Sequence, residues 1–86
     1  MLRQHEAQLI ISGAERRMEA AYKAMRPETL RKNQGTRTVL SIRDGTLLIS
    51  FEADTIPSLR ALVNSYLRWL FVIEKTLDIV ENKSGN

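Results

Sequence analysis

Residues 39–53, Val-Leu-Ser-Ile-Arg-Asp-Gly-Thr-Leu-Leu-Ile-Ser-Phe-Glu-Ala, contain the strongest structural signal in the chain. Leu40 and Ile42 alternate with their neighbours before Asp44-Gly45, and every second residue from 47 to 53 is apolar after it. A period of two is typical of a strand, and Asp-Gly favours the two-residue turn whose positive φ angles match the twist of paired strands. The stretch therefore predicts a β-hairpin.

A further strand and a helix are expected before the hairpin. Residues 4–11 alternate with a period of two, which predicts a strand, whereas residues 14–25 place apolar side chains three and four positions apart, which predicts a one-sided helix. Ser12 is the expected cap of this helix, with Glu15 at the spacing of a capping box. The helix should end by Arg26, because the residue before a proline is pushed away from helical geometry.

A polar loop is expected over residues 28–35, which are punctuated by Asn and Gly. After the hairpin, the pattern changes to a long helix from about residue 56 to about residue 80. Asp54 or Thr55 can cap this helix, and Pro57 is tolerated in its first turn because the missing N–H has no helical partner there. Residues 82–86 are expected to form a frayed, disordered tail.

These elements give the order β-α-β-β-α in a single domain spanning residues 1–86. We expect an α+β fold with a three-stranded, meander-like antiparallel sheet and both helices packed on one face. The chain contains no internal repeat, no low-complexity segment and no linker long enough to separate two domains.

The long helix carries more apolar surface than a small sheet can cover. Its core stripe consists of Leu59, Val63, Tyr66, Leu70, Ile73 and Leu77. Further apolar or small residues lie to one side of the stripe, at Ala61, Leu62, Ser65, Trp69, Val72, Ile79 and Val80, and two more lie at its other edge, at Leu67 and Phe71. A surface helix needs an apolar stripe only about 100° wide. The surplus either packs within the chain or receives a helix of another subunit, and the few apolar positions of the first helix favour the second interpretation.

Positive charge is concentrated in the middle of the chain. The net charge is +3, yet residues 15–43 hold eight basic and three acidic residues. Such a distribution suits a polyanion such as RNA, because neutralising phosphates releases counterions. The alternative is a basic helix face and loop that are simply solvated.

Residues suited to catalysis are scarce. The 86 residues include no cysteine and one histidine, and they show no phosphate-binding loop, dinucleotide motif or metal-spaced carboxylate cluster. His5 has no positioned partner for general-base chemistry. We therefore expect no catalytic residue, no metal, no cofactor and no small-molecule substrate.

No apolar run approaches the roughly 18–20 residues of a membrane span, so we expect no membrane association and an intracellular location.

An RNA-binding module related to KH folds is an alternative, because the order β-α-β-β-α invites that comparison. However, the chain lacks a G-x-x-G clamp, and its strands lack the paired exposed aromatic residues that stack bases. Any RNA contact would then be mainly electrostatic, through basic side chains on phosphates.

Three stretches resemble one known family. Residues 58–70, Ser-Leu-Arg-Ala-Leu-Val-Asn-Ser-Tyr-Leu-Arg-Trp-Leu, look like the signature helix of the small Pcc-type subunit of the KEOPS (EKC) complex, a family that includes the cancer–testis antigen (CTAG/LAGE-like) proteins. Residues 48–54 are similar to the strand that leads into this helix, and residues 20–28 resemble the end of the family's first helix. Ser12-Gly13-Ala14 departs from the family's usual helix entry.

The resemblance implies a non-catalytic scaffold that forms homodimers and binds the threonylcarbamoyl-transferase subunit of the complex, which makes N6-threonylcarbamoyladenosine in tRNA. It also implies a cytoplasmic location, or a nuclear one in a eukaryote. Carried onto this sequence, it places the contact with a partner helix on Ala61, Leu62, Ser65, Trp69 and Val72. Arg60, Asn64 and Arg68 form a polar stripe that is either solvated or bound to the partner or tRNA. Candidate tRNA contacts are Arg16, Arg17, Lys23, Arg31, Lys32 and Arg37.

Overall fold

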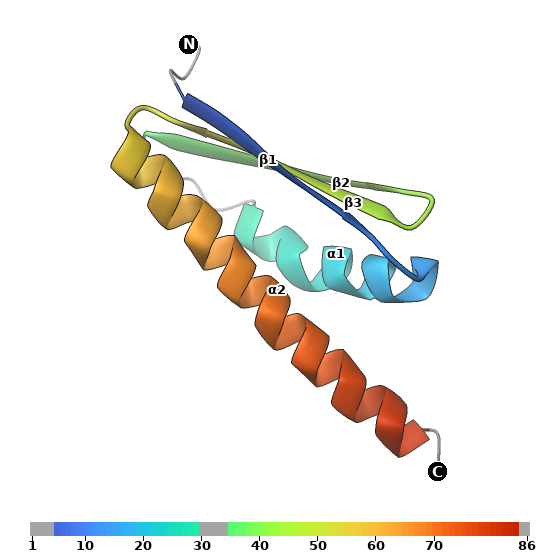
Figure 1. Cartoon of the computed structure of the whole chain (residues 1–86). Coiled ribbons are helices and arrows are strands. Elements are labelled where there is room, and N and C mark those ends of the chain that lie inside the picture. Colours follow the sequence, from blue (N-terminus) through green and yellow to red (C-terminus); the bar gives the residue numbers. More distant parts are fainter. Residues whose placement is uncertain (1–4, 30–34, 85–86) are drawn as a thin grey trace.

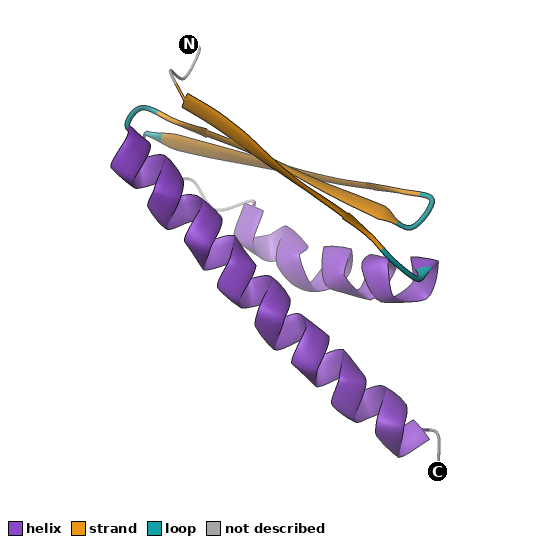
Figure 2. Ribbon diagram, in the orientation of Figure 1, coloured by secondary structure: helices purple, strands orange, loops and turns teal. Residues whose placement is uncertain are grey.

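The computed structural model describes residues 5–29 and 35–84 of the chain. Its elements are β1 (His5–Ser12), α1 (Glu15–Thr29), β2 (Thr36–Arg43), β3 (Thr46–Ala53) and α2 (Ile56–Ser84). The expected α+β class and β-α-β-β-α order are confirmed, and both helices lie on the same face of the antiparallel sheet (Figures 1 and 2). The outer face of the sheet carries no helix among the described residues.

The strand order differs from the expected meander, because β3 lies at the centre of the sheet and the order is β1-β3-β2. Both neighbours pair with β3 in antiparallel fashion, so β1 and β2 run parallel to each other. Parallel strands need a crossover connection, and α1 provides it across the helical face. Ile49 illustrates the consequence, since it pairs with Leu9 on one side and Leu40 on the other. The most apolar strand, β3, therefore lies at the centre of the sheet, where both of its edges are paired.

The hairpin turn forms as predicted at Asp44-Gly45. Both residues have positive φ angles, 50° and 77°, as a two-residue hairpin turn of this type requires. The turn also contacts the junction between β1 and α1, because the N–H of Gly13 donates a hydrogen bond to the carbonyl of Gly45 over 3.1 Å. A Cβ atom at Gly45 would lie 2.9 Å from the Gly13 carbonyl oxygen, so this position has no room for a side chain.

Both ends of α1 differ from expectation. Ser12 belongs to β1, where its hydroxyl lies 3.2 Å from that of Thr46, and the carbonyl of Ala14 instead receives the first helical hydrogen bond, from Met18. The helix also continues past Pro27 to Thr29. The proline stands in the last turn, where one hydrogen bond is lost at little cost, and packing of the preceding turn against the sheet outweighs the local preference.

Helix α2 begins where the sequence predicts. The hydroxyl of Thr55 accepts a hydrogen bond from the N–H of Ser58 over 3.2 Å, so Thr55 rather than Asp54 is the cap. The helix ends later than expected, at Ser84, and therefore includes three residues of the expected tail; residues 85–86 lie outside the described part. At about 1.5 Å per residue, 29 residues span roughly 43 Å. Toward its C-terminus α2 diverges from the sheet (Figure 1).

The core lies between the sheet and the two helices. α1 packs mainly on β2, and α2 packs on β3 and β1. The buried members come from α1 (Met18, Ala21, Met25), β3 (Leu47, Ile49, Phe51) and α2 (Tyr66, Ile73). All six residues of the predicted α2 core stripe are buried or packed against this cluster. The core stripe predicted from spacing is therefore confirmed.

Candidate protein–protein interface

The exposed large apolar side chains of the described residues concentrate on α2. Seven of nine lie there, each at least 43% exposed: Ile56, Leu67, Trp69, Phe71, Val72, Ile79 and Val80; the other two, Ile10 and Val39, lie on β1 and β2. The prediction that the chain's own core would leave part of this helix uncovered is confirmed. Apolar groups gathered on one element, outside the core, are typical of a surface that binds another protein.

No helix in the described part of the chain has the length and apolar character needed to cross a membrane.

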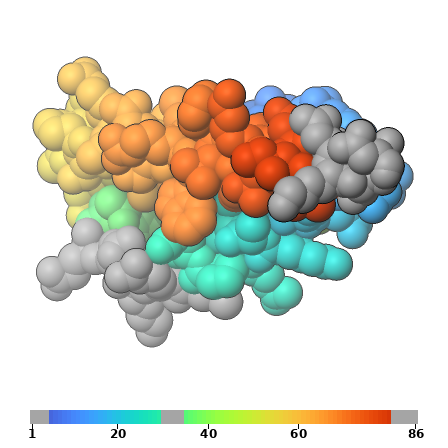
Figure 3. All heavy atoms as spheres, turned by 90° about the horizontal axis from the view of Figure 1, so that it is seen from below, coloured from blue at the N-terminus to red at the C-terminus, as the bar shows by residue number. Residues whose placement is uncertain are grey.

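One group of predicted contact residues forms what we call the Trp69 face, defined as Ala61, Leu62, Ser65, Trp69 and Val72. Figure 3 shows the helical side of the molecule, where α1 and α2 lie side by side. Trp69 is 43% exposed and Val72 is 57% exposed, whereas Leu62 packs against the core. Ala61 is exposed and Ser65 is half-buried. The five residues thus lie on one side of α2. Leu62 is at the edge that packs on the core, and Ala61 and Val72 are at the edge exposed to solvent.

Trp69 stands between two hollows of the surface. The first, of about 250 Å³, lies where the end of α1, the start of β2 and the middle of α2 meet. Its lining includes Glu28, Thr38, Ser65 and Trp69. The second is a shallow pocket of about 300 Å³ on α2 itself, lined by Ser65, Arg68, Trp69 and Val72. The small side chain of Ser65 lines both hollows, so its size keeps them open.

Tyr66 connects the Trp69 face to the core. Its ring is buried and packs edge-on against Phe51, while its hydroxyl bonds to Thr38 in the first hollow. Burial raises the pKa of Tyr66; the hydrogen bond with Thr38 opposes this rise, and the carboxylate of Glu28 adds to it. The phenol therefore stays protonated at neutral pH and can donate a hydrogen bond there.

The predicted polar stripe, Arg60, Asn64 and Arg68, lies on the outward side of α2, and all three residues are exposed. Arg68 donates a hydrogen bond to the hydroxyl of Ser65 over 3.5 Å, which places its guanidinium beside the Trp69 face. Arg60 lies about 80° around the helix axis from Arg68, because eight residues at 100° per residue leave that rotation. The stripe therefore turns gradually around the exposed side of the helix.

Of the candidate tRNA contacts, the structure describes residues on α1 and on β2. Arg16 and Lys23 lie seven positions apart on the outward side of α1, and both are exposed. Arg37, on β2, is exposed and lies 3.9 Å from a carboxylate oxygen of Glu52. Arg31 and Lys32 lie outside the described residues.

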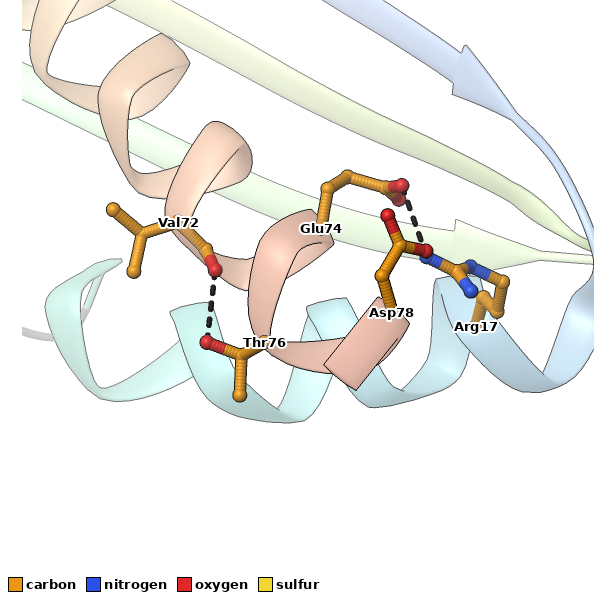
Figure 4. Close-up of polar contacts among 5 residues, drawn as sticks. All are labelled: Arg17, Val72, Glu74, Thr76 and Asp78. Carbon is orange, nitrogen blue, oxygen red and sulfur yellow. Dashed lines mark hydrogen bonds and ion pairs between the residues drawn. The ribbon is translucent and has the colours of Figure 1, made fainter. Parts of the chain in front are cut away.

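Arg17, another candidate tRNA contact, lies between the two helices. Its Nη2 atom lies 3.0 Å from Oε2 of Glu74 and 2.9 Å from Oδ1 of Asp78, and its side chain is 19% exposed (Figure 4). The guanidinium therefore joins α1 to the C-terminal half of α2. Its charge is shared with these two carboxylates. Within residues 5–29 and 35–84, no three His, Cys, Asp or Glu side chains converge as a metal site would require.

Comparison with known proteins identifies the family. A family model described as Transcription factor Pcc1 matches residues 10–78. The chain belongs to the Pcc1 family. This is a family of KEOPS subunits, so the resemblance drawn from residues 20–28, 48–54 and 58–70 is confirmed. No curated protein sequence matches the chain.

A chain of a solved complex shares the fold. A chain in the crystal structure of a binary Gon7–Pcc1 complex superposes with a TM-score of 0.79 at 24% sequence identity. The match covers 90% of this chain and 96% of the other. The fold of that chain is thus shared over nearly the whole length of this one.

The sequence did not reveal two polar features of the site. The ion pairs of Arg17 join residues 57 and 61 positions apart, and nothing local indicates such a pairing. The bond between Tyr66 and Thr38 depends on where β2 meets α2, which follows from the strand order. The exposed apolar flank of α2, in contrast, could be located from its 3.6-residue periodicity alone.

Proposed function

We propose that this chain is a non-catalytic, dimerising scaffold subunit of the KEOPS complex. It binds the threonylcarbamoyl-transferase subunit through the Trp69 face and so supports the formation of N6-threonylcarbamoyladenosine in tRNA, in the cytoplasm. The observation that carries the proposal is the exposed apolar surface along α2 in a chain of the Pcc1 family.

The spacing of the Trp69 face suits an incoming helix. Leu62, Ser65, Trp69 and Val72 follow intervals of three, four and three, which is the spacing of a seam between two packed helices. The pocket beside Trp69 offers a recess for an apolar side chain of the partner, since Ser65 leaves space there. A helix of the transferase subunit lying along this seam would cover both Trp69 and Val72.

Trp69 is the expected anchor of this contact. Tryptophan is enriched among the residues whose truncation weakens binding most, typically by about 2 kcal/mol or more. It is 43% exposed here, so a partner can bury the remaining apolar surface without rearranging the core. The apolar surface of Val72 extends the same contact.

The test combines Trp69→Ala with Ser65→Arg. The first change removes the anchor, and the second places a long charged side chain that cannot be desolvated at a close helix crossing. We expect the double variant to lose co-purification with the transferase subunit and to bind it at least roughly thirtyfold more weakly in calorimetry.

Phe71→Ala provides the matched control. Phe71 is also an exposed aromatic residue of α2, at 64%, but it lies on the opposite flank of the helix. This variant should bind the transferase subunit as the wild type does. An equal loss in both variants, or unchanged binding by the double variant with a native circular dichroism spectrum, would contradict the proposed face. If the chain bound tRNA tightly and in a salt-dependent way but did not bind the transferase subunit, an RNA-binding module would be favoured instead.

A further inference from the structure

The first hollow beside Trp69 differs in chemistry from the Trp69 face. We call it the Glu28 hollow; it has a volume of about 250 Å³ and lies where the start of β2 reaches the surface between α2 and the end of α1 (Figure 3). Its lining includes Glu28 and Thr29 of α1, Thr38 of β2, and Tyr66 and Trp69 of α2. Three elements thus direct polar groups to one recess.

The described lining of the Glu28 hollow is rich in hydrogen-bond acceptors. An ionised carboxylate only accepts hydrogen bonds, and each hydroxyl oxygen has lone pairs that accept. The hydroxyl of Thr29 already donates its proton to the carbonyl of Arg26 over 2.8 Å, so its oxygen is left to accept. A group that brings several donors therefore suits the hollow better than one that brings acceptors.

Glu28 supplies the charge of this lining. Its carboxylate lies near enough to the hydroxyl of Tyr66 to raise the pKa of that phenol. Arg37 also lines the hollow, but its guanidinium lies 3.9 Å from Glu52, its partner across the strands on the outer face of the sheet. Successive side chains of a strand point to opposite faces, so Thr38 points toward the hollow and Arg37 points away from it. The hollow therefore attracts a cation.

Trp69 forms a wall of the hollow and favours a flat cation. The face of an indole ring attracts a positive charge, and a guanidinium group can stack on it. A guanidinium group also carries several N–H donors in a fixed fork and is more weakly hydrated than an ammonium group, so it can reach acceptors on α1, β2 and α2 at once. Arginine is enriched at protein interfaces, whereas lysine is depleted there.

We propose that the Glu28 hollow binds the guanidinium group of an arginine side chain carried by the helix of the transferase subunit that lies along the Trp69 face. The inference rests on the proposed function and adds the chemistry that the partner must supply. Ser65 and Trp69 line both hollows, so a helix on this seam passes the mouth of each. The partner then presents the arginine and an apolar residue within one helical turn of each other.

The charge on the other side of Trp69 has the opposite sign. Arg68 lines the shallow pocket there and donates a hydrogen bond to the hydroxyl of Ser65 over 3.5 Å. A partner helix laid in the reverse direction would bring its arginine toward Arg68, which is repulsive, and away from Glu28. The two charges therefore select the direction in which the partner helix crosses α2.

The first experiment tests the hollow with small probes. The chain contains a single tryptophan, so the indole N–H signal in NMR belongs to Trp69. The wild-type chain is titrated with ethylguanidinium chloride and with ethylurea, which is also planar but uncharged. Ethylguanidinium should shift the signal with an apparent affinity at least roughly tenfold higher than that of ethylurea. Glu28→Gln keeps the size of the side chain and should remove this preference. Glu19→Gln, at an exposed position of α1 outside both hollows, should keep it.

The second experiment uses the transferase subunit itself. In calorimetry, Glu28→Gln should bind it at least roughly tenfold more weakly than the wild type, whereas Glu19→Gln should bind it normally. Each arginine of the transferase helix is then replaced by glutamine, alone and against Glu28→Gln. The arginine that enters the hollow should show a coupling free energy in this double-mutant cycle. Thermal melting checks that each variant is folded.

The outcomes separate this inference from the proposed function. Unchanged transferase binding by folded Glu28→Gln, or an equal response of the indole signal to both probes, overturns the inference and leaves the scaffold role intact. A Glu28-dependent response to spermidine, with no coupled arginine on the transferase, shows that the hollow takes a free polyamine and also overturns it. A wild-type chain that does not bind the transferase subunit contradicts the proposed function. The probe titration then decides alone whether the hollow is an arginine site.

Discussion

The ring of Tyr66 stands edge-on to the ring of Phe51, with centroids 5.1 Å apart and ring planes at 67°. This pair joins α2 to the central strand, because Phe51 is fully buried on β3 and Tyr66 is 5% exposed on the inner side of the helix. Edge-to-face packing is a favoured aromatic geometry. The contact sets the rotation of α2 about its axis, and that rotation directs Trp69 to one flank and Phe71 to the other.

Tyr66→Phe should leave this ring contact in place and remove one hydrogen bond. We expect the free energy of unfolding to fall by about 1 kcal/mol, because Thr38 loses its partner at a half-buried site. Urea denaturation of the two proteins measures the difference. A loss several times larger would mean that the phenol supports more than this hydrogen bond.

The same variant tests the raised pKa of Tyr66. In the unfolded chain a tyrosine ionises near pH 10, and burial raises the pKa in the folded chain. As the pH rises from about 10 toward the higher folded-state pKa, the unfolded chain loses this proton first, so the stability falls. The melting temperature of the wild type should therefore drop more steeply than that of Tyr66→Phe in this window. If the melting temperatures of the two proteins fell equally with pH, the pKa of Tyr66 would not be raised in the folded chain.

Gly45→Ala should destabilise the fold. The φ angle of 77° is strained for any residue with a side chain, and the new Cβ would lie 2.9 Å from the Gly13 carbonyl oxygen. We expect a loss of more than about 1 kcal/mol in thermal or urea unfolding. Gly13→Ala is the matched control, because its Cβ would meet the flexible end of Met18 at 3.2 Å, and it should cost less.

The ion pairs of Arg17 should couple the two helices measurably. We propose a double-mutant cycle in urea denaturation with Arg17→Met and Asp78→Asn. The coupling free energy should be about 1 kcal/mol and should shrink at high salt, because the carboxylate is largely exposed while the guanidinium is sheltered. Arg16→Met, at the exposed neighbouring position, should give no coupling with Asp78→Asn.

Arg16 and Lys23 provide the sharpest test of a tRNA contact, because they share the outward side of α1. Replacing both with glutamate should weaken tRNA binding by the assembled complex and lower its salt dependence. Each lost phosphate contact reduces the slope of log K against log salt by about 0.7–0.9. An unchanged slope would mean that this side of α1 does not face the tRNA.

Local patterns predicted most of the secondary structure, because the interactions that decide it are close in sequence. The Asp44-Gly45 turn needs two residues that tolerate positive φ angles, and the α2 core stripe follows from 3.6 residues per turn. The end of α1 could not be predicted in this way, since packing of its last turns outweighs the preference set by Pro27.

The sequence by itself determined the element order, the hairpin and the surplus of apolar surface on α2, all of which arise from residues within one or two turns of each other. Only the tertiary structure decided that β3 is central and that Arg17 holds α2 to α1. These relationships join distant parts of the chain. Their energies depend on which elements meet, and that is settled only when the whole core packs at once.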